Sequence, residues 1–360
     1  MTGIAATPDG IPVPAPEPQP IPDDGAAPPP AAEAPERDDR RRRRFLLLFL
    51  LLALLILLIG IALWYFLFRQ PIPLPLPTTV DLPGYTTSLY GATGPMGVAS
   101  SPDGTRVYVA QTGGDKTVVI FDGSGNRIGI AQPPAATTGD EHVPVWMALD
   151  PLTSDLYVSD RPTGAVYQYD RDGSYMRTVQ LAVPIPGWQP MGLAFDAAGN
   201  LYVADLAGAT PRVEEFDRSM NLVRTFGASD NLSFANGVAV DGKGNVYVAD
   251  SDNGRVLVYR PDGTSLTQVG RGVAEGKLGM PRGLAIDGRG RLYIVDNTAQ
   301  GVVLMQLNDG ATPSLDYLGL VGGPGIEDGR FTFPNGVAAD GRGRLYVTDT
   351  GNDRVQMWSY

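Results

Sequence analysis

The polar residues with the most regular spacing in this chain are aspartates, and the residue types around them limit the chemistry they could support. Each aspartate ends a stretch in which a tyrosine is flanked by apolar residues, and the members are Asp160, Asp205, Asp250, Asp296 and Asp349. The 360 residues include no cysteine and one histidine. Disulfides, thiolate nucleophiles and zinc sites built from several Cys and His ligands are therefore excluded. A bound metal would be an oxygen-liganded cation such as calcium or magnesium.

The spacing between these acids and arginines favours a structural role. Asp250 precedes Arg255 by five residues, and Asp349 precedes Arg354 by the same interval, which lets the two charges meet across a hairpin. Repetition in nearly every copy favours turn capping and a hairpin ion pair over catalysis. The nearby Asp-Gly-Lys-Gly and Asp-Gly-Arg-Gly segments lack the spaced carboxylates and final Glu of a calcium loop. We interpret them as tight turns.

The aspartates belong to a unit that occurs six times. One copy reads NGVAVDGKGNVYVAD from Asn236, and another reads NGVAADGRGRLYVTD from Asn335. Successive copies are 45 to 53 residues apart, with Ala110 taking the place of the acid in the first copy. Apolar residues alternate at period two between Gly, Asp and Asn turns, which predicts four short antiparallel strands per copy. Such sheets bury their faces by packing around an axis, so we expect a six-bladed β-propeller over residues 85–360.

The sixth copy lacks a fourth strand of its own. Its third strand is expected at residues 355–359, and a strand-like segment at residues 85–89 precedes the first copy. Pairing of these two segments would close the ring and remove an exposed sheet edge. Loss of residues 85–90 should therefore markedly destabilise the domain.

The repeat resembles the NHL repeat. The shared pattern is a Pro or small residue, any residue, Gly, an apolar pair and Asp, then Gly-Asn, Leu/Val-Tyr-Val-Ala-Asp and Asn-x-Arg-Val. The resemblance covers about 276 of the 360 residues and is strongest in copies four and six, whereas Ala110 and Ala148 depart from it. It implies an all-β, six-bladed propeller. The domain is similar to the NHL sensor domains of some bacterial membrane kinases, although the 39 residues before the anchor cannot form a kinase.

One position that varies inside the repeat is a candidate binding site. It lies between the Pro or Ala and the Gly of each first strand, and the first strand of a propeller blade is innermost. We expect these side chains to ring the axial entrance on one face: Met96, Trp146, Met191, Asn236, Arg282 and Asn335, with Trp146 placed by alignment. Apolar groups, amides and a guanidinium suit a shallow surface for a protein, peptide or glycan ligand. The alternative is that these residues only plug the channel.

A second hypothesis is an enzyme on the same scaffold. The resemblance implies two groups of enzymes to consider. Amidating lyases need zinc held by histidines, and streptogramin lyase-like propellers use a histidine with magnesium. One histidine excludes the first, and His142 matches no motif of the second; we expect it to be a solvated loop residue rather than a general base. Gluconolactonase-type hydrolases use Glu, Asn and Asp around an axial calcium, for which Asn236 and Asn335 are suitable. We predict a binding or scaffold module without a cofactor, with a calcium-dependent hydrolase or lactonase as the alternative.

The N-terminal region predicts a tail, a membrane anchor and a stalk. Residues 1–39 contain eleven prolines and few large apolar residues, which predicts a disordered tail. The anchor, residues 40–69, has five arginines at 40–44, then 24 uncharged residues at 45–68, then Arg69. The uncharged run is about 36 Å of helix, enough to cross a lipid bilayer. A Pro-rich stalk follows at residues 70–84. The positive-inside rule predicts a single-pass protein of the cell membrane with a cytoplasmic tail and an extracytoplasmic propeller.

Two other interpretations of the apolar segment fit less well. A cleaved signal peptide has a shorter apolar run and a small-residue cleavage site, and a twin-arginine export signal usually has a less apolar core. Beyond the anchor, residues 70–360 carry 21 basic and 31 acidic side chains, a net charge of −10. Nucleic-acid-binding domains carry a basic face, so we expect no nucleic-acid partner.

Overall fold

The computed structural model describes residues 36–68, 81–135, 141–208, 210–272 and 274–360. The predicted tail up to residue 35 and the predicted stalk up to residue 80 lie outside these ranges. The chain divides into two compact units, residues 1–78 and 79–360. Each unit is described by itself.

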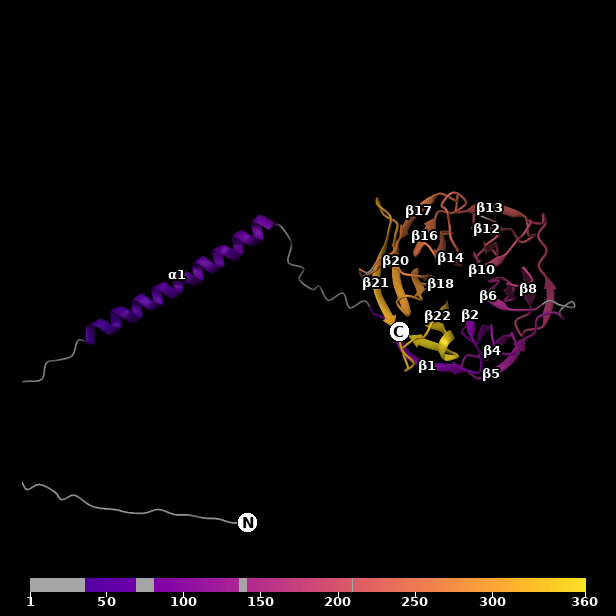
Figure 1. Ribbon diagram of the computed structural model, residues 1–360, viewed down its shortest axis with the longest axis horizontal. Coiled ribbons are helices and arrows are strands. Elements are labelled where there is room, and N and C mark those ends of the chain that lie inside the picture. The colour runs from indigo at the N-terminus through magenta and orange to yellow at the C-terminus, as the bar shows by residue number, and fades with distance from the viewer. Residues whose placement is uncertain (1–35, 69–80, 136–140, 209, 273) are drawn as a thin grey trace, which may run out of the picture. The chain divides into compact units, whose positions relative to one another are not determined.

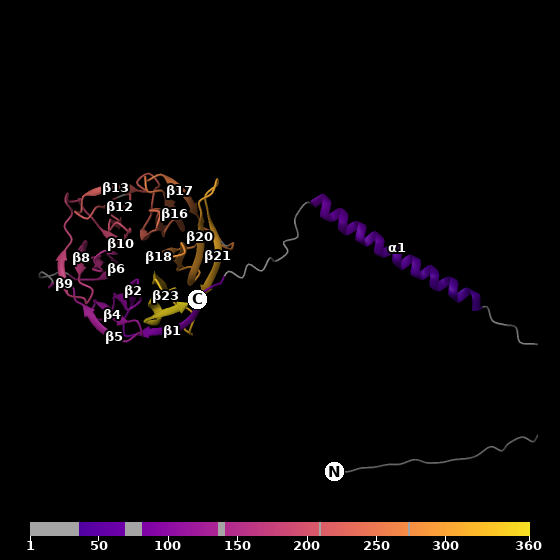
Figure 2. The same cartoon turned by 180° about the vertical axis from the view of Figure 1, so that it is seen from behind.

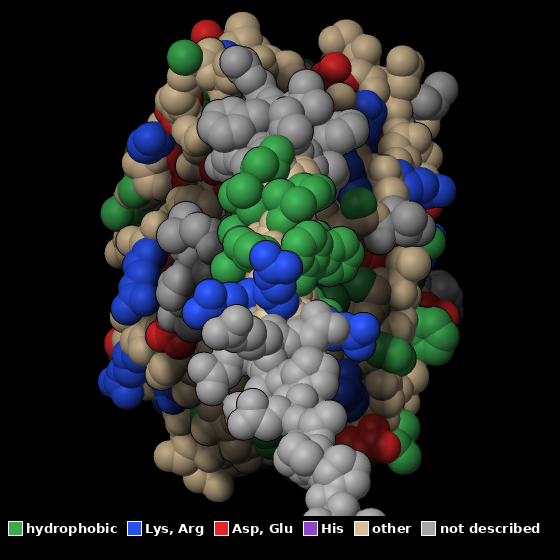
Figure 3. Space-filling view, turned by 90° about the vertical axis from the view of Figure 1, so that its left-hand side faces the viewer, with side chains coloured by type: hydrophobic (Ala, Val, Ile, Leu, Met, Phe, Trp, Pro, Cys, Tyr) green, Lys and Arg blue, Asp and Glu red, His purple; other side chains and the backbone are tan. Residues whose placement is uncertain are grey.

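The first unit contains one long helix, α1 (Glu36–Phe68). Its apolar segment Arg41–Ile61 has 21 residues, and an 18-residue window within it has a mean hydropathy of 3.0 and is not buried. Figure 3 shows basic side chains beside a continuous hydrophobic surface. This helix is long and apolar enough to span a membrane. It begins at Glu36, so residues 36–39 are helical rather than part of the predicted tail, in keeping with the preference of acidic residues for the first turn of a helix.

The second unit is a ring of six four-stranded antiparallel sheets, which confirms the predicted six-bladed β-propeller (Figures 1 and 2). The inner strands are β2 (Pro95–Ser100), β6 (Pro144–Leu149), β10 (Pro190–Phe195), β14 (Ala235–Val240), β18 (Pro281–Ile286) and β22 (Pro334–Ala339). The second strands are β3 (Arg106–Gln111), β7 (Leu156–Asp160), β11 (Leu201–Asp205), β15 (Val246–Asp250), β19 (Arg291–Asp296) and β23 (Arg344–Asp349).

The outer half of each blade completes the sheet. The third strands are β4 (Val118–Asp122), β8 (Ala165–Tyr169), β12 (Arg212–Phe216), β16 (Arg255–Tyr259), β20 (Gly301–Asn308) and β24 (Arg354–Ser359). The outermost strands are β5 (Arg127–Ala131), β9 (Tyr175–Thr178), β13 (Leu222–Phe226), β17 (Ser265–Val269), β21 (Ser314–Gly322) and β1 (Gly84–Tyr90). A short 3-10 helix, η1 (Thr350–Asn352), lies between β23 and β24. We number the blades one to six in the order of their inner strands.

Ring closure follows the prediction. Strand β1 is the outermost strand of blade six and pairs antiparallel with β24, with Tyr85 opposite Trp358 and Leu89 opposite Val355. Leu89 is buried in an apolar cluster that joins blades six and one. The first and last strands of the domain therefore share one sheet (Figure 1).

Glycine near the start of the inner strands reflects close packing around the axis. A Cβ added to Gly237 would lie 2.3 Å from the carbonyl oxygen of Arg282, and one added to Gly336 would lie 2.6 Å from that of Met96. Side chains at these positions would collide with the backbone of the next blade. The glycines thus bring neighbouring inner strands together and fix where the preceding residue lies at the axis.

Candidate functional site

The candidate site lies on the face where the inner strands begin and the second strands end, around the axis; we call this region the axial mouth. The repeated aspartates lie here and serve the fold. Asp250 Oδ1 accepts the Ser233 N–H at 2.6 Å, and Asp250 Oδ2 accepts the Arg255 Nε–H at 2.7 Å. The predicted capping and hairpin ion pair are both confirmed for this residue.

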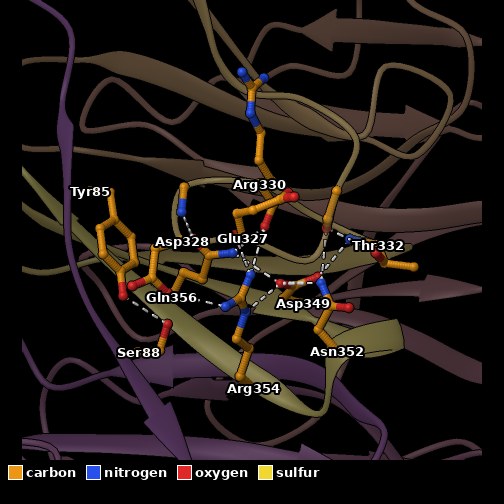
Figure 4. Close-up of polar contacts among 12 residues, drawn as sticks. Tyr85, Ser88, Glu327, Asp328, Arg330, Thr332, Asp349, Asn352, Arg354 and Gln356 are labelled. Carbon is orange, nitrogen blue, oxygen red and sulfur yellow. Dashed lines mark hydrogen bonds and ion pairs between the residues drawn. The ribbon is translucent and has the colours of Figure 1, made fainter.

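Blade six has the most extensive version of this arrangement (Figure 4). Arg354, which is 4% exposed, donates Nε–H to Asp349 at 2.7 Å and Nη2–H to the carbonyl oxygens of Glu327 and Arg330. Gln356 also donates to Asp349, at 2.9 Å. Acid and guanidinium satisfy each other, so this pair is not available to a ligand.

Blade one carries a neutral version, and the structure corrects the residue assigned to it. Pro95 pairs with Gln111 as Pro144 pairs with Asp160, so Gln111, and not Ala110, takes the place of the acid. Its Oε1 accepts the Thr93 N–H at 3.2 Å, and its Nε2–H donates to Thr117 Oγ1 at 3.0 Å. The amide reproduces both bonds of the acid without charge.

The six predicted ring residues all come from the inner strands, but one of them is out of register. Met96, Met191, Asn236, Arg282 and Asn335 are second in their strands, whereas Trp146 is third and Val145 is second. Trp146 thus takes the place of the strand glycine. The reason is a longer turn in blade two, where Asp150 N–H bonds to Asp155 O rather than to a residue four positions on, as Asp196 does to Asn200. Counting back from the repeated acid therefore misplaced the alignment by one residue.

Most of these residues are buried at the axis, and four of them bond to one another in pairs. Trp146, Met191, Asn236 and Asn335 are 7%, 6%, 2% and 4% exposed, whereas Met96 and Arg282 are half-buried. Trp146 Nε1–H donates to Asn236 Oδ1 at 2.9 Å. Arg282 Nε–H donates to Asn335 Oδ1 at 3.0 Å. Both amide oxygens that suited an axial calcium already accept N–H donors, so this donor set does not fit the calcium alternative.

A hollow of about 390 Å³ lies at the axial mouth on the side of blades two to four. Its lining combines apolar side chains with one cation and one amide, and consists of Arg161, Gln189, Pro190, Met191, Leu206, Pro211 and Phe234. Met191 is the one predicted ring residue in this lining. We call this feature the mouth hollow.

The mouth hollow lies where a bond between neighbouring blades is missing. The residue after the repeated acid bonds to the first carbonyl of the next inner strand in three blades: Ser251 to Pro281 at 2.5 Å, Asn297 to Pro334 at 3.2 Å and Thr350 to Pro95 at 2.5 Å. The corresponding residues of blades two and three are Arg161 and Leu206, and both line the hollow. A guanidinium and an isobutyl group thus replace the short polar side chains that join blades four, five and six to the next blade. In blade one the corresponding Thr112 bonds within its own blade, to Gly94 O at 2.9 Å.

Arg282 adds a second positive charge beside the mouth hollow. Its guanidinium carbon lies 6.0 Å from the centroid of the Phe234 ring, and Phe234 lines the hollow. Burial is the main cause that lowers the pKa of Arg282; Asp252 opposes this shift, and the positive charge of Arg161 adds to it. The two arginines are therefore close enough to repel each other.

His142, the single histidine, is half-buried and enclosed by neighbouring side chains rather than solvated as predicted. Its side chain is 10% exposed, with Nδ1 3.2 Å from Asp160 Oδ2 and the ring edge-on to Tyr167 at 5.5 Å between centroids. Nε2 is buried and has no hydrogen-bond partner in the described part of the chain. In blade two this imidazole takes the role that an arginine has in blades four and six, and it is not among the residues that line the mouth hollow.

Sequence reasoning missed Arg161, Gln189, Leu206 and Phe234. Two of them directly follow the repeated acid, and the other two directly precede an inner strand. Extending the repeat alignment by one position on each side would have shown that these positions vary. Their grouping into one hollow depends on strand register and could not be read from the alignment.

Comparison with known proteins supports the fold and the repeat. The NHL repeat family model matches residues 232–259 and 331–357, which fall in blades four and six. No curated protein sequence matches the chain. Among solved structures, the luciferin-regenerating enzyme superposes with a TM-score of 0.56 at 17% identity, covering 76% of this chain and 93% of that one.

Two lyase structures are also similar. Virginiamycin B lyase from Staphylococcus aureus has a TM-score of 0.54 at 11% identity, covering 76% of this chain and 98% of the lyase. A streptogramin B lyase has a TM-score of 0.54 at 12% identity, covering 76% and 96%. At these identities the likeness shows the fold alone. The family model thus identifies NHL repeats in blades four and six, and the closed ring of six sheets is a six-bladed β-propeller.

Proposed function

We propose that this chain is a membrane-anchored binding module whose extracytoplasmic propeller holds a protein, peptide or glycan ligand at the axial mouth. The observation that carries the proposal is the mouth hollow, where apolar walls meet Arg161, whose side chain has no hydrogen bond or ion pair within the described ranges. Binding sites commonly combine such walls with a few convergent polar groups. The other polar side chains of the mouth, such as Asn236, Asn335 and Asp250, are engaged in bonds within the propeller.

Binding is favoured over catalysis because the described residues of the mouth hollow offer no nucleophile paired with a base. His142 would be the natural general base, but Asp160 and the Tyr167 ring enclose it. The lyase and luciferin-regenerating names belong to proteins that share the fold at low identity. A calcium-dependent hydrolase remains the alternative. Asn236 and Asn335 do not support it, because their amide oxygens accept bonds from Trp146 and Arg282.

The membrane part of the proposal rests on α1. Arg41 to Arg44 are exposed at the start of the apolar segment, and basic residues flank the cytoplasmic end of membrane spans. By this rule we expect the residues before the helix to be cytoplasmic and the propeller to lie on the other side, joined by the Pro-rich stalk.

The binding proposal is tested with the full chain in lipid nanodiscs, applied to arrays of decapeptides and of oligosaccharides. Leu206→Asp places a charge in the mouth hollow, and Leu152→Asp places the same charge on an exposed leucine outside it. We expect at least one array ligand whose signal is lost with Leu206→Asp and kept with Leu152→Asp, at unchanged melting temperature. Absence of any binder, or equal loss in both variants, would refute the proposal.

Membrane topology is tested by labelling, because the cysteine-free chain gives no background. Single cysteines are introduced as Thr2→Cys before the helix and as Ser124→Cys on an exposed propeller turn. A membrane-impermeant maleimide added to intact cells should label the second and not the first. Labelling of both in unbroken cells, or of Thr2→Cys alone, contradicts the proposed orientation.

A further inference from the structure

We infer that the mouth hollow recognises the C-terminal carboxylate of a peptide that ends in an apolar residue, with Arg161 and Arg282 as the anion-binding pair. This inference rests on the proposed binding function and specifies its ligand. Three properties of the mouth hollow support it: the positive charge beside it, its apolar walls and its size.

Among the described residues the two arginines have no carboxylate partner, unlike the arginines that close the hairpins of blades four and six. Arg255 and Arg354 each lie 2.7 Å from a buried aspartate. Arg282 instead donates to the neutral amide of Asn335 and lies over the Phe234 ring, and Arg161 is exposed. In the described ranges, neither has an acid within ion-pair distance, and Asp252 is the acid whose charge acts on Arg282. Two neighbouring cations without an acidic partner in the described ranges, one of them half-buried, favour an anionic ligand.

The walls of the mouth hollow add an apolar requirement to the charge. Met191, Leu206 and Phe234 line it beside Arg161. A hydrophilic anion such as phosphate would leave these surfaces without a partner, whereas a hydrocarbon side chain removes them from water. The ligand should therefore carry an apolar group next to its negative charge.

A peptide C-terminus satisfies both demands at once, because its carboxylate and its last side chain are attached to the same carbon. An internal Asp or Glu offers the charge without the apolar group, and a neutral glycan offers neither. The exposed Gln189 side chain lines the same hollow, and its amide can donate to and accept from the peptide backbone. A volume of about 390 Å³ lies in the range of small-ligand sites, which fits a short terminal segment.

The test compares two probes that differ in one group. Fluorescein-labelled Ala-Ala-Phe with a free carboxylate and the same peptide as its C-terminal amide are titrated into the full chain in nanodiscs, and binding is followed by fluorescence anisotropy. We expect the carboxylate to bind at least tenfold more tightly, since a charge-assisted bond is lost in the amide. Arg161→Gln and Arg282→Gln should each weaken carboxylate binding at least tenfold and leave amide binding unchanged.

A matched control has the same charge change elsewhere. Arg260 is exposed at the end of β16 far from Asp250, so Arg260→Gln should bind both peptides as the wild type does. Melting temperatures of all variants establish folding, and Arg161→Lys should retain part of the preference through its charge.

The outcomes separate this inference from the function on which it rests. Equal affinity for the two peptides, or equal loss with Arg260→Gln, overturns the carboxylate assignment. If Leu206→Asp still abolishes an array ligand, the binding function stands with a different ligand class, such as a neutral glycan. If no peptide and no array ligand binds, both fail together.

Discussion

The two sides of the axial mouth use the same backbone in different ways. Across blades four, five and six, the residue after the repeated acid bonds to the next inner strand through Ser251, Asn297 or Thr350. Across blades two and three, Arg161 and Leu206 take that position and line the mouth hollow. Among the described residues, blade one also lacks the bond to the next blade, but its Thr112 bonds to Gly94 O of the same blade. The mouth hollow thus coincides with the two positions where the short polar side chain itself is replaced.

A second contrast concerns the pair that closes each hairpin. Blades four and six use a buried aspartate with an arginine, whereas blade one uses Gln111 with Thr117. Both versions cap the loop before the inner strand. The capping geometry therefore depends on the position in the repeat and not on charge. Charge makes the pair more sensitive to the loss of one member.

The largest expected effect breaks the charged version. Arg354→Ala leaves Asp349 buried without its cation, and we expect a loss of about 3–5 kcal/mol in the free energy of unfolding. Thr117→Val in blade one removes one neutral bond and should cost about 1 kcal/mol. Denaturant unfolding of both variants measures the difference; equal costs would show that charge adds nothing to the pair.

Ring closure comes next in size. Leu89 is 3% exposed and packs between blades six and one, so Leu89→Ala should cost about 2–4 kcal/mol through lost burial and a cavity. Thr87 is exposed in the same strand, and Thr87→Ala should change stability by less than about 0.5 kcal/mol. Thermal melting tests both, and a small effect at Leu89 would mean that the seam contributes little.

A smaller effect tests the bonds between blades. Thr350 Oγ1 donates to Pro95 O and accepts from Asn335 Nδ2, so Thr350→Val should cost about 1–2 kcal/mol. The reverse change, Leu206→Ser, supplies a hydroxyl for the bridge that blade three lacks. It should weaken ligand binding while leaving the melting temperature unchanged or higher. A ligand affinity equal to that of the wild type would show that the missing bond is not what creates the binding site.

The smallest expected effect depends on pH. Glu214 is 1% exposed, and burial, then the charge of Asp205, raise its pKa above the ordinary 4.5, against the lowering effect of Arg212. Between that value and the raised one, the native state holds a proton that the unfolded state has lost, so stability falls as pH rises through this window.

Glu214→Gln removes this dependence. The equivalent Gln356 of blade six donates to its aspartate at 2.9 Å, and an amide at 214 should form the same bond with Asp205. We expect a gain of about 1 kcal/mol at pH 7 and a flatter stability curve between pH 4.5 and 7. Exposed Glu275→Gln is the control, and a gain of the same size there would contradict the assignment.

The fold followed from the sequence because its signals are local and repeated. Alternating valines between Asp-Gly turns predicted the strands, and the absent fourth strand of copy six predicted the pairing of β1 with β24. Register was less secure. One extra residue in the turn after Asp150 displaced Trp146, and one extra residue in the corresponding turn after Ser101 concealed Gln111.

The candidate site was predictable only in part for a physical reason. Asn236 and Asn335 look like free polar groups in the sequence, but Trp146 and Arg282 bond to their oxygens from other blades. Conversely, nothing in the sequence singles out Arg161 and Leu206. The structure draws attention to them because they do not form the bond to the next inner strand that Ser251, Asn297 and Thr350 form. Which side chains satisfy one another across blades is a property of the closed ring.

The pairing of β1 with β24 also determines where tension would enter the propeller. The residues that join the domain to helix α1 precede Gly84, and Gly84 is the first residue of β1, opposite Ser359. A pull between a bound ligand and the anchor would thus load this seam before any other strand pair. No covalent cross-link reinforces the ring, because the chain has no cysteine. The main-chain hydrogen bonds of one antiparallel strand pair would set the force at which the ring opens.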